Sequence, residues 1–214
     1  MKTDTLIAML ANGPVAADPR LPERRLAAAA TVALPLAIVA MLATLGLRPD
    51  LSPAAALPMF WLKLLFPASI AVAAYVAVAR LARPAGTAAG AWGAVAVALA
   101  LVWTLALGSL LAAAPGERGA MIFGYTALPC VASVAALSLP IFAATLWTLR
   151  TLAPTRPRNA GAAAGLLAGA MAAVVYALHC DEMTLGFLAV WYVLGMTLPA
   201  ALGALLGPRL LRWA

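Results

Sequence analysis

The chain has 214 residues, of which 65% are hydrophobic and 10% are charged, and its mean hydropathy is +1.01. Soluble domains are about 45–50% apolar and about 25% charged, so an ordinary water-soluble domain is excluded. A chain this short cannot hide so much apolar surface in one core, which indicates an integral membrane protein. The net charge of +7 does not indicate direct nucleic-acid binding, because the basic residues lie between apolar runs rather than along one face.

Residues 1–25 form a polar tail without the uninterrupted apolar run of a signal peptide. Asp4 can cap a short helix, and Asn12-Gly13-Pro14 can end it. The helix carries an apolar stripe of Leu6, Ile7, Met9 and Leu10. Such a short helix is marginal alone in water, so we expect it to order against the groove of a soluble partner or against membrane lipid.

Charged residues divide the remainder into six apolar stretches near the ~20 residues that a spanning helix needs. The predicted fold is all-α, an integral membrane bundle of six transmembrane helices over residues 26–208, followed by a cytoplasmic end at 209–214. The predicted helices are approximately 26–47, 59–80, 88–112, 122–149, 159–180 and 184–207. We expect a loop within residues 113–124, between the third and fourth helices.

The positive charges orient this bundle. Eleven of the 14 Lys and Arg residues lie in the tail, the second and fourth loops and the C-terminus. The other side holds only Arg48, Lys63 and Arg118. Because cytoplasmic loops carry the excess of positive charge, both termini are predicted to be cytoplasmic. Lys63, near the outer end of its helix, is expected to snorkel to the interface, with a buried counter-ion for Asp50 or Glu117 as the alternative.

Glycine recurs every fourth residue in three places: Gly161, Gly165 and Gly169, then Gly86 and Gly90, then Gly203 and Gly207. Such rows let helix backbones approach closely in a membrane. They predict tight packing within the chain, with a homo-oligomer seam as the alternative.

Enzymatic chemistry is not expected. Membrane transporters and enzymes usually place ionisable residues near the bilayer midplane, and the predicted spans have none there. A single histidine cannot build a histidine metal cage or a Ser-His-Asp triad. We therefore predict no catalytic residue and no cofactor.

The two cysteines, Cys130 and Cys180, lie 20 and 22 residues from Arg150 and Arg158, or ~30 and ~33 Å along a helix. They reach the same outer level, where an oxidising compartment permits a disulfide. Potential metal ligands lie beside the second cysteine: His179, Asp181 and Glu182. The alternative is that both cysteines are small apolar packing residues.

Several segments together resemble one family. They are Lys2–Leu10, Leu45–Leu51 with Arg-Pro-Asp-Leu, Pro58–Lys63 with Trp-Leu-Lys, Ala82-Arg-Pro84, Val190–Met196 and Leu202–Trp213. Over nearly the whole chain the sequence resembles the NrsF-type anti-sigma factors. These are six-span proteins of the bacterial inner membrane that hold an extracytoplasmic-function sigma factor inactive and release it under oxidative or heavy-metal stress.

The resemblance implies roles for individual residues. It places sigma-factor binding on Asp4, Leu6, Ile7 and Leu10, and sensing on Cys130 and Cys180. The chain departs from the family pattern at Cys180-Asp-Glu182, where the family has Cys-Pro-Glu. Arg48, Asp50 and Lys63 recur in the family without an assigned role, and we interpret them as an outer polar collar.

The predicted function is therefore that of a membrane-bound anti-sigma factor whose tail sequesters the sigma factor. A cysteine pair near the outer face, which could also bind a metal with His179 and Glu182, would control release. The alternatives are a small-solute transporter or channel, or a structural subunit of a membrane complex. Signalling requires an element with two states, and the fifth helix, which leads to Cys180, is the expected one.

Overall fold

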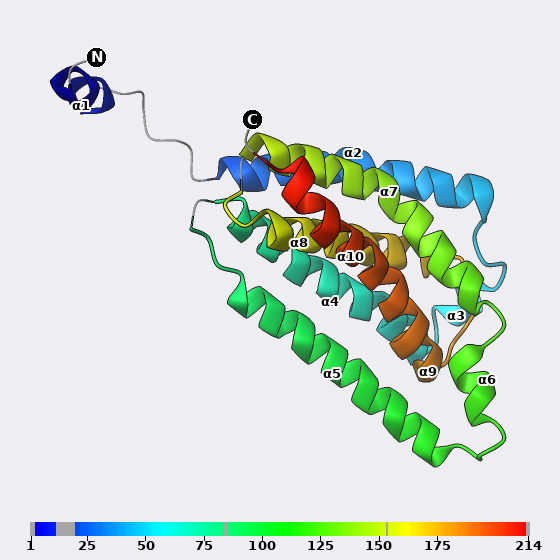
Figure 1. The fold of residues 1–214 in the computed structure, drawn as a ribbon. Coiled ribbons are helices and arrows are strands. Elements are labelled where there is room, and N and C mark those ends of the chain that lie inside the picture. The colour runs from blue at the N-terminus through cyan, green and yellow to red at the C-terminus, as the bar shows by residue number, and fades with distance from the viewer. Residues whose placement is uncertain (1–2, 12–19, 84, 153, 213–214) are drawn as a thin grey trace.

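The computed structural model describes residues 3–11, 20–83, 85–152 and 154–212, and every regular element in these ranges is a helix. Six helical segments are long and apolar enough to span a membrane, as predicted. Successive spans run in opposite directions (Figure 1). They are α2 (Leu21–Thr44), α4 (Pro58–Leu81), α5 (Ala89–Ala112), α6 with α7 (Arg118–Phe123 and Ala127–Leu152), α8 (Pro157–Tyr176), and α9, η1 and α10 (Leu185–Phe187, Leu188–Tyr192 and Val193–Leu210). The other two helices are short: α1 (Thr3–Ala11) and α3 (Leu51–Ala54).

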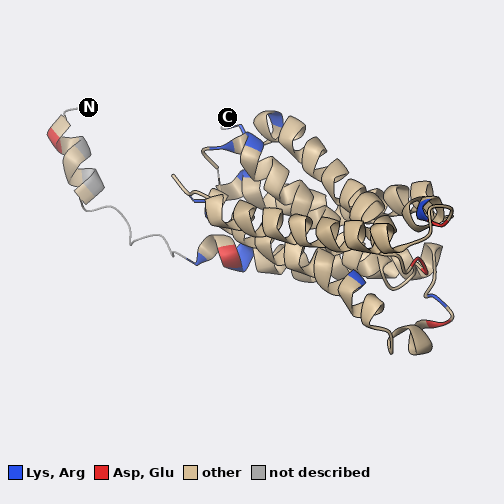
Figure 2. Cartoon of the chain, turned by 90° about the horizontal axis from the view of Figure 1, so that it is seen from below, with Lys and Arg blue, Asp and Glu red and all other residues tan. Residues whose placement is uncertain are grey.

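The bundle has two chemically different ends. The end where α2 begins and α10 finishes, here called the basic end, holds most of the positive charge (Figure 2). It includes Arg20, Arg24, Arg25, Arg80, Arg83, Arg150, Arg156, Arg158, Arg209 and Arg212. The opposite end, here called the cysteine end, holds Arg48, Lys63 and Arg118 among the described residues. This distribution is the one from which the topology was predicted.

Helix α8 is the centre of the bundle, with 78% of its span buried. Its small residues allow close approach to α10. A Cβ atom at Gly161 would meet the Gly203 carbonyl oxygen, and one at Gly165 would meet the Pro199 carbonyl oxygen. The predicted packing of glycine rows within the chain is confirmed for these two helices. The row at Gly86 and Gly90 differs, because a Cβ atom at Gly90 would meet nothing within 4 Å.

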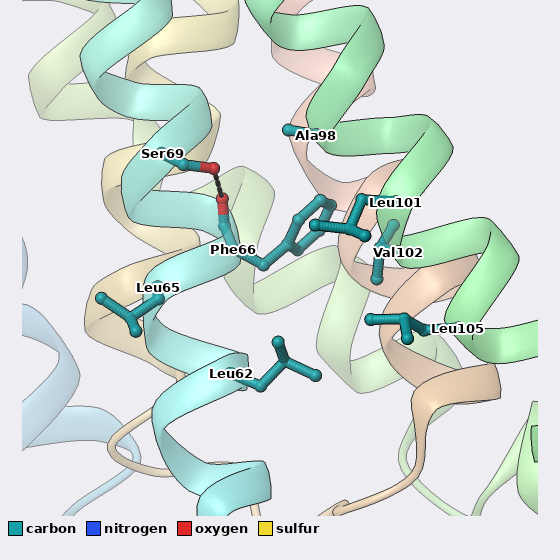
Figure 3. A pocket seen from close by; sticks show the side chains of 8 residues that line it. All are labelled: Leu62, Leu65, Phe66, Ser69, Ala98, Leu101, Val102 and Leu105. Carbon is teal, nitrogen blue, oxygen red and sulfur yellow. Dashed lines mark hydrogen bonds between the residues drawn. The ribbon is translucent and has the colours of Figure 1, made fainter.

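Helix α5 lies at the edge of the bundle, with only 17% of its span buried. It packs on α4 through large apolar side chains around a pocket of about 220 Å³ (Figure 3). The side chains of Leu62, Phe66 and Leu101 line this pocket, and the Ser69 hydroxyl donates to the Phe66 carbonyl oxygen at 2.7 Å instead of facing into it. The pocket is therefore an apolar gap between helices and not a polar path.

Most helix boundaries differ from the predicted ones by one to five residues, and two of these differences have a clear local cause. Helix α2 begins at Leu21 rather than at residue 26, with a proline in its first turn, where a missing N–H costs nothing. Helix α8 ends at Tyr176 rather than at residue 180, because the N–H groups of His179 and Cys180 both bond to the Tyr176 carbonyl oxygen. Cys180 therefore lies outside the helices. It belongs to residues 177–184, which join α8 to α9 and are here called the connecting segment.

The expected connection within residues 113–124 is present, but it contains a short helix, α6, over Arg118–Phe123 and is not a loop throughout. The chain turns sharply at Gly124, whose φ is +51°. This left-handed conformation favours glycine. Tyr125 and Thr126 follow this turn and lie at the cysteine end, directly before α7 begins.

The last span is one continuous helix that changes type along its length. It begins as α9, passes through the π-helical segment η1, and continues as α10. A π segment inside an α-helix rotates the side chains that follow it and often marks a functional site. Here it ends at the fully buried Tyr192.

Candidate functional site

The cysteine end gathers both cysteines in one buried cluster. Cys130, in the first turn of α7, is 0% exposed, and Cys180, after α8, is 2% exposed. Both are free thiols. The buried side chains of Tyr176 and Tyr192 lie at the same end, with ring centroids 6.1 Å apart. The structure therefore places both cysteines, buried, at the same end of the bundle, as their spacing in the sequence predicted.

Lys63 lies inside this cluster. Its side chain is 1% exposed, and its Nζ donates to the carbonyl oxygens of Cys180 at 2.6 Å and Glu182 at 2.8 Å. The expectation that Lys63 snorkels outward is wrong, because α4 presents it to the carbonyl groups of the connecting segment. The alternative pairing with Asp50 or Glu117 is not formed either, since Asp50 is paired with Arg48 and Glu117 is exposed.

Arg48 also binds the Cys180 carbonyl oxygen that Lys63 binds. It follows α2, is 5% exposed, and its Nη1 donates to the Cys180 carbonyl oxygen at 3.1 Å. Its backbone N–H also donates to the Leu178 carbonyl oxygen at 3.2 Å. Arg48 and Lys63 together form what we call the carbonyl clamp, two cations on the backbone of Cys180. Arg48 and Lys63 were predicted to belong to an outer polar collar, but both are buried and form this clamp.

Asp50 holds the guanidinium of Arg48 in place. Its two carboxylate oxygens accept from Nε and Nη2 of Arg48, each at 2.7 Å. This two-point geometry fixes the orientation of the planar guanidinium. These hydrogen bonds from Arg48 hold the pKa of Asp50 below its usual value, while those to Asp50 raise the pKa of Arg48. The Arg48–Asp50 pair is therefore charged at neutral pH.

Glu182 anchors the connecting segment to the turn that precedes α7. Its carboxylate is buried and accepts from the backbone N–H groups of Tyr125 at 2.8 Å and Thr126 at 3.3 Å, and from the Thr126 hydroxyl at 3.2 Å. Gly124 makes room for it, because a Cβ atom there would collide with this carboxylate. The role of Glu182 in this geometry is to accept hydrogen bonds across helices.

The predicted metal set of Cys130, Cys180, His179 and Glu182 is not assembled. In residues 3–11, 20–83, 85–152 and 154–212, no three His, Cys, Asp or Glu side chains are placed to hold a metal ion. His179 turns its Nδ1 toward the Gly46 carbonyl oxygen at 3.0 Å, and Glu182 is occupied by α7. Among these four, only the two cysteines share a cluster.

The π-helical segment is tied to α6 and α5 by indole groups. Trp191 Nε1 donates to the Ile122 carbonyl oxygen at 2.8 Å, and Trp103 Nε1 donates to the Ala189 carbonyl oxygen at 2.9 Å. The Thr184 hydroxyl donates to the Met121 carbonyl oxygen at 2.8 Å. The segment from Cys180 to Tyr192 is consequently attached to three neighbouring helices, α4, α5 and α6.

The sequence analysis missed four residues of this site: Tyr125, Thr126, Tyr176 and Tyr192. Two of them follow Gly124, and a glycine in an expected loop is a signal for such a turn. The two buried tyrosines carried a weaker signal, because a phenol within a span needs a polar neighbour. Nothing in the sequence indicated which neighbour that would be.

The tail residues form α1, as expected, and its first turn contains Asp4. Asp4 and Ile7 are exposed. The side chains of Leu6, Met9 and Leu10 lie outside the described part of the structure. Figure 1 draws α1 apart from the bundle.

Comparisons with known proteins bear on this architecture. A family model described as "Negative regulator of sigma F" matches residues 10–213. The chain belongs to the NrsF family. It is 46% identical over 213 residues to the probable anti-sigma-F factor NrsF of Azospira oryzae, and 39% identical over 215 residues to the anti-sigma-F factor NrsF of Caulobacter vibrioides. Both alignments cover 100% of each chain.

No solved structure matches the chain. The family match confirms the predicted resemblance and supports an anti-sigma role with a sigma factor as partner. It begins at residue 10, so most of α1 is covered by the two relatives and not by the family model.

Proposed function

We propose that this chain is an anti-sigma factor of the bacterial inner membrane that binds an extracytoplasmic-function sigma factor through α1. The observation that carries the proposal is full-length similarity to two anti-sigma-F factors, joined to a bundle whose tail emerges at the basic end. Because positive charge marks the cytoplasmic side, the tail would face the compartment in which sigma factors act.

Transport is less well supported as a function. The buried hydroxyl residues of α7 bond to carbonyl oxygens of their own helix and do not line a path; they are Ser138, Thr145 and Thr148. The pocket of Figure 3 is apolar. These contacts favour a regulatory bundle over a conduit.

Stress sensing would occur at the cysteine cluster. A disulfide between Cys130 and Cys180, or a soft metal ion bound by both thiolates, would bring the connecting segment toward α7. This movement would displace the side chains of the carbonyl clamp, because Arg48 and Lys63 both bind the backbone of Cys180. The cluster thus links a chemical change to two other helices.

Helix α2 is better placed than α8 to carry the change to the tail. Only 22% of its span is buried, against 78% for α8, whose glycine packing on α10 leaves little room to move. Gly46 and Arg48, which follow the outer end of α2, contact the connecting segment. The inner end of α2 follows the tail. We therefore assign the transmitting role to α2 instead of the fifth span.

The experiment that tests sigma binding changes the apolar stripe of α1. Leu6→Asp with Leu10→Asp should put two charges into an apolar groove and reduce co-purification of the sigma factor at least tenfold. The matched control is Thr5→Asp with Ala11→Asp, which adds the same charge at exposed positions. Equal retention of the sigma factor by both double variants would contradict binding through the stripe.

A further inference from the structure

Two further cavities follow α4 from the pocket of Figure 3 toward the basic end. The first, of about 290 Å³, lies between α4 and α5 and shares Ser69 with that pocket. The second, of about 420 Å³, shares Val76 and Arg80 with the first. We call the two cavities together the basic-end groove. Apart from Ser69 and Arg80, the part between α4 and α5 is lined by Val72, Ala73, Val76, Gly90, Ala91 and Ala94.

The part of this groove between α4 and α5 has the depth of one membrane leaflet. Positions 69 and 80 are 11 residues apart, or about 16 Å along a helix that rises 1.5 Å per residue. The hydrocarbon core of a bilayer is about 30 Å thick. The apolar walls therefore cover the depth that an acyl chain occupies in the leaflet at the basic end.

Gly90 keeps the groove open on the α5 side. A Cβ atom there would meet nothing within 4 Å, whereas one at Gly161 or Gly165 would collide with the backbone of α10. The missing side chain of Gly90 therefore leaves space in the groove and does not serve contact between two helix backbones. Helix α5 has only 17% of its span buried, so a molecule in the membrane must cover this apolar surface.

The mouth of the groove at the basic end offers one uncompensated positive charge. It is lined by Glu23, Tyr75, Arg80 and Arg83. Nη2 of Arg83 donates to the Glu23 carboxylate at 2.7 Å, so these two charges compensate each other. Within the described ranges, the exposed side chain of Arg80 makes no hydrogen bond and no ion pair. A guanidinium binds phosphate well, because its planar fork of N–H groups matches two phosphate oxygens.

We propose that the basic-end groove binds an anionic glycerophospholipid, with one acyl chain between α4 and α5 and the phosphate on Arg80. Basic pockets between transmembrane helices bind anionic headgroups in this way. A lipid with net negative charge fits better than a zwitterionic one, because Glu23 is already paired with Arg83 and does not attract a headgroup ammonium. This site depends neither on sigma-factor binding nor on the cysteines.

A second copy of the chain fits the same groove less well. Two copies inserted with the same topology lie parallel, so their basic ends would come together. A helix of the second copy in the groove would bring its own arginines close to Arg80, and like charges repel. A phosphate group in that place attracts Arg80 instead. The charge at the mouth therefore favours lipid over a dimer.

The test uses the full chain, purified in detergent, with dioleoyl phosphatidylglycerol or dioleoyl phosphatidylcholine added. Native mass spectrometry of a lipid titration gives the apparent affinity and counts the chains in each particle. Phosphatidylglycerol, which is anionic, should bind at least fivefold more tightly than the zwitterionic phosphatidylcholine. Equal affinities for the two lipids would overturn the selection of an anionic headgroup.

Arg80→Gln tests the contact with the headgroup. It should weaken the binding of phosphatidylglycerol about fivefold, because a basic residue near the headgroups contributes about 1 kcal/mol. The matched control is Arg209→Gln, which removes one exposed positive charge at the basic end and away from the groove. This control should change the affinity less than twofold. Equal weakening by both variants would show binding to the overall charge of the basic end, and would overturn the site.

Gly90→Leu tests the contact with the acyl chain. The new side chain has room, and leucine favours a helix over glycine, so the variant should fold while it fills the groove. It should weaken phosphatidylglycerol binding at least fivefold. The control is Gly108→Leu, the same change at an open position near the other end of α5. Unchanged binding in Gly90→Leu would refute the acyl-chain contact. Particles of two chains that become single chains in Gly90→Leu would identify a second copy as the occupant and overturn the proposal.

Discussion

At the cysteine end, Glu182 and Lys63 are buried, and each makes at least two hydrogen bonds to another segment. At the basic end, two polar contacts between side chains of different helices are exposed. Glu23 pairs with Arg83 at 2.7 Å, with both side chains 43% exposed, and Arg25 donates to the Thr151 hydroxyl at 3.1 Å. Exposed pairs exchange with water at little cost, whereas buried groups that lose a partner are left unsatisfied.

This difference fits the proposed sensing function, in which the cysteine end is held firmly and the basic end can change its contacts easily. In the proposed sensing function, a chemical change at the cysteine end would move several hydrogen-bonded segments together. The basic end, which follows the tail in the chain, could then rearrange by breaking contacts that contribute little to stability. This distribution of contacts supports the proposed direction of signalling, from the cysteine end to the tail.

The largest expected difference between the two ends comes from removing a glutamate at each. Glu182→Ala leaves the N–H groups of Tyr125 and Thr126 without a partner, and should lower the free energy of unfolding by about 2–5 kcal/mol. Glu23→Ala should cost at most about 1 kcal/mol, because its pair is exposed. Thermal unfolding of the purified variants in one detergent measures both. Equal losses would show that the two ends are held equally firmly.

The fold could largely be predicted from the sequence because its signals are local. Apolar stretches between charges predicted the six spans, and the rows of glycine predicted the approach of Gly161 to Gly203. The start of α2 was missed because the charged residues of its first turns give no hydropathy signal. Helix α6 was missed because Gly116, Gly119 and Gly124 indicated a loop there.

The site was predictable only in part, because it depends on contacts between distant segments. The equal heights of Cys130 and Cys180 follow from residue spacing. The burial of Lys63 does not, since it depends on carbonyl oxygens more than a hundred residues away that carry no side-chain signature. A lysine near a helix end has the same pattern whether it snorkels or points inward.

A smaller difference is expected from two tryptophans. Trp191→Phe removes the hydrogen bond to the Ile122 carbonyl oxygen but keeps an aromatic ring, and should cost about 0.5–1.5 kcal/mol. Trp147, toward the basic end, is 73% exposed. Trp147→Phe is the matched control and should be close to neutral in the same unfolding measurement. A neutral Trp191→Phe would show that the π-helical segment is not held by this bond.

The smallest effect is expected at Asp50, where the cysteine end meets water. Asp50→Asn weakens the two-point contact with Arg48, and the loss should depend on pH in one direction. Because Arg48 lowers the pKa of Asp50 in the folded protein, the pair stabilises the fold above the ordinary aspartate pKa of about 3.9. This contribution disappears as the pH falls through the lowered folded value. The difference in melting temperature between the native chain and Asp50→Asn should therefore be constant near neutral pH and shrink below about pH 4. Glu117→Gln removes one exposed negative charge at the same end and controls for net charge. If the Asp50→Asn difference instead grew as the pH fell, the Arg48–Asp50 pair would not be what orients the clamp.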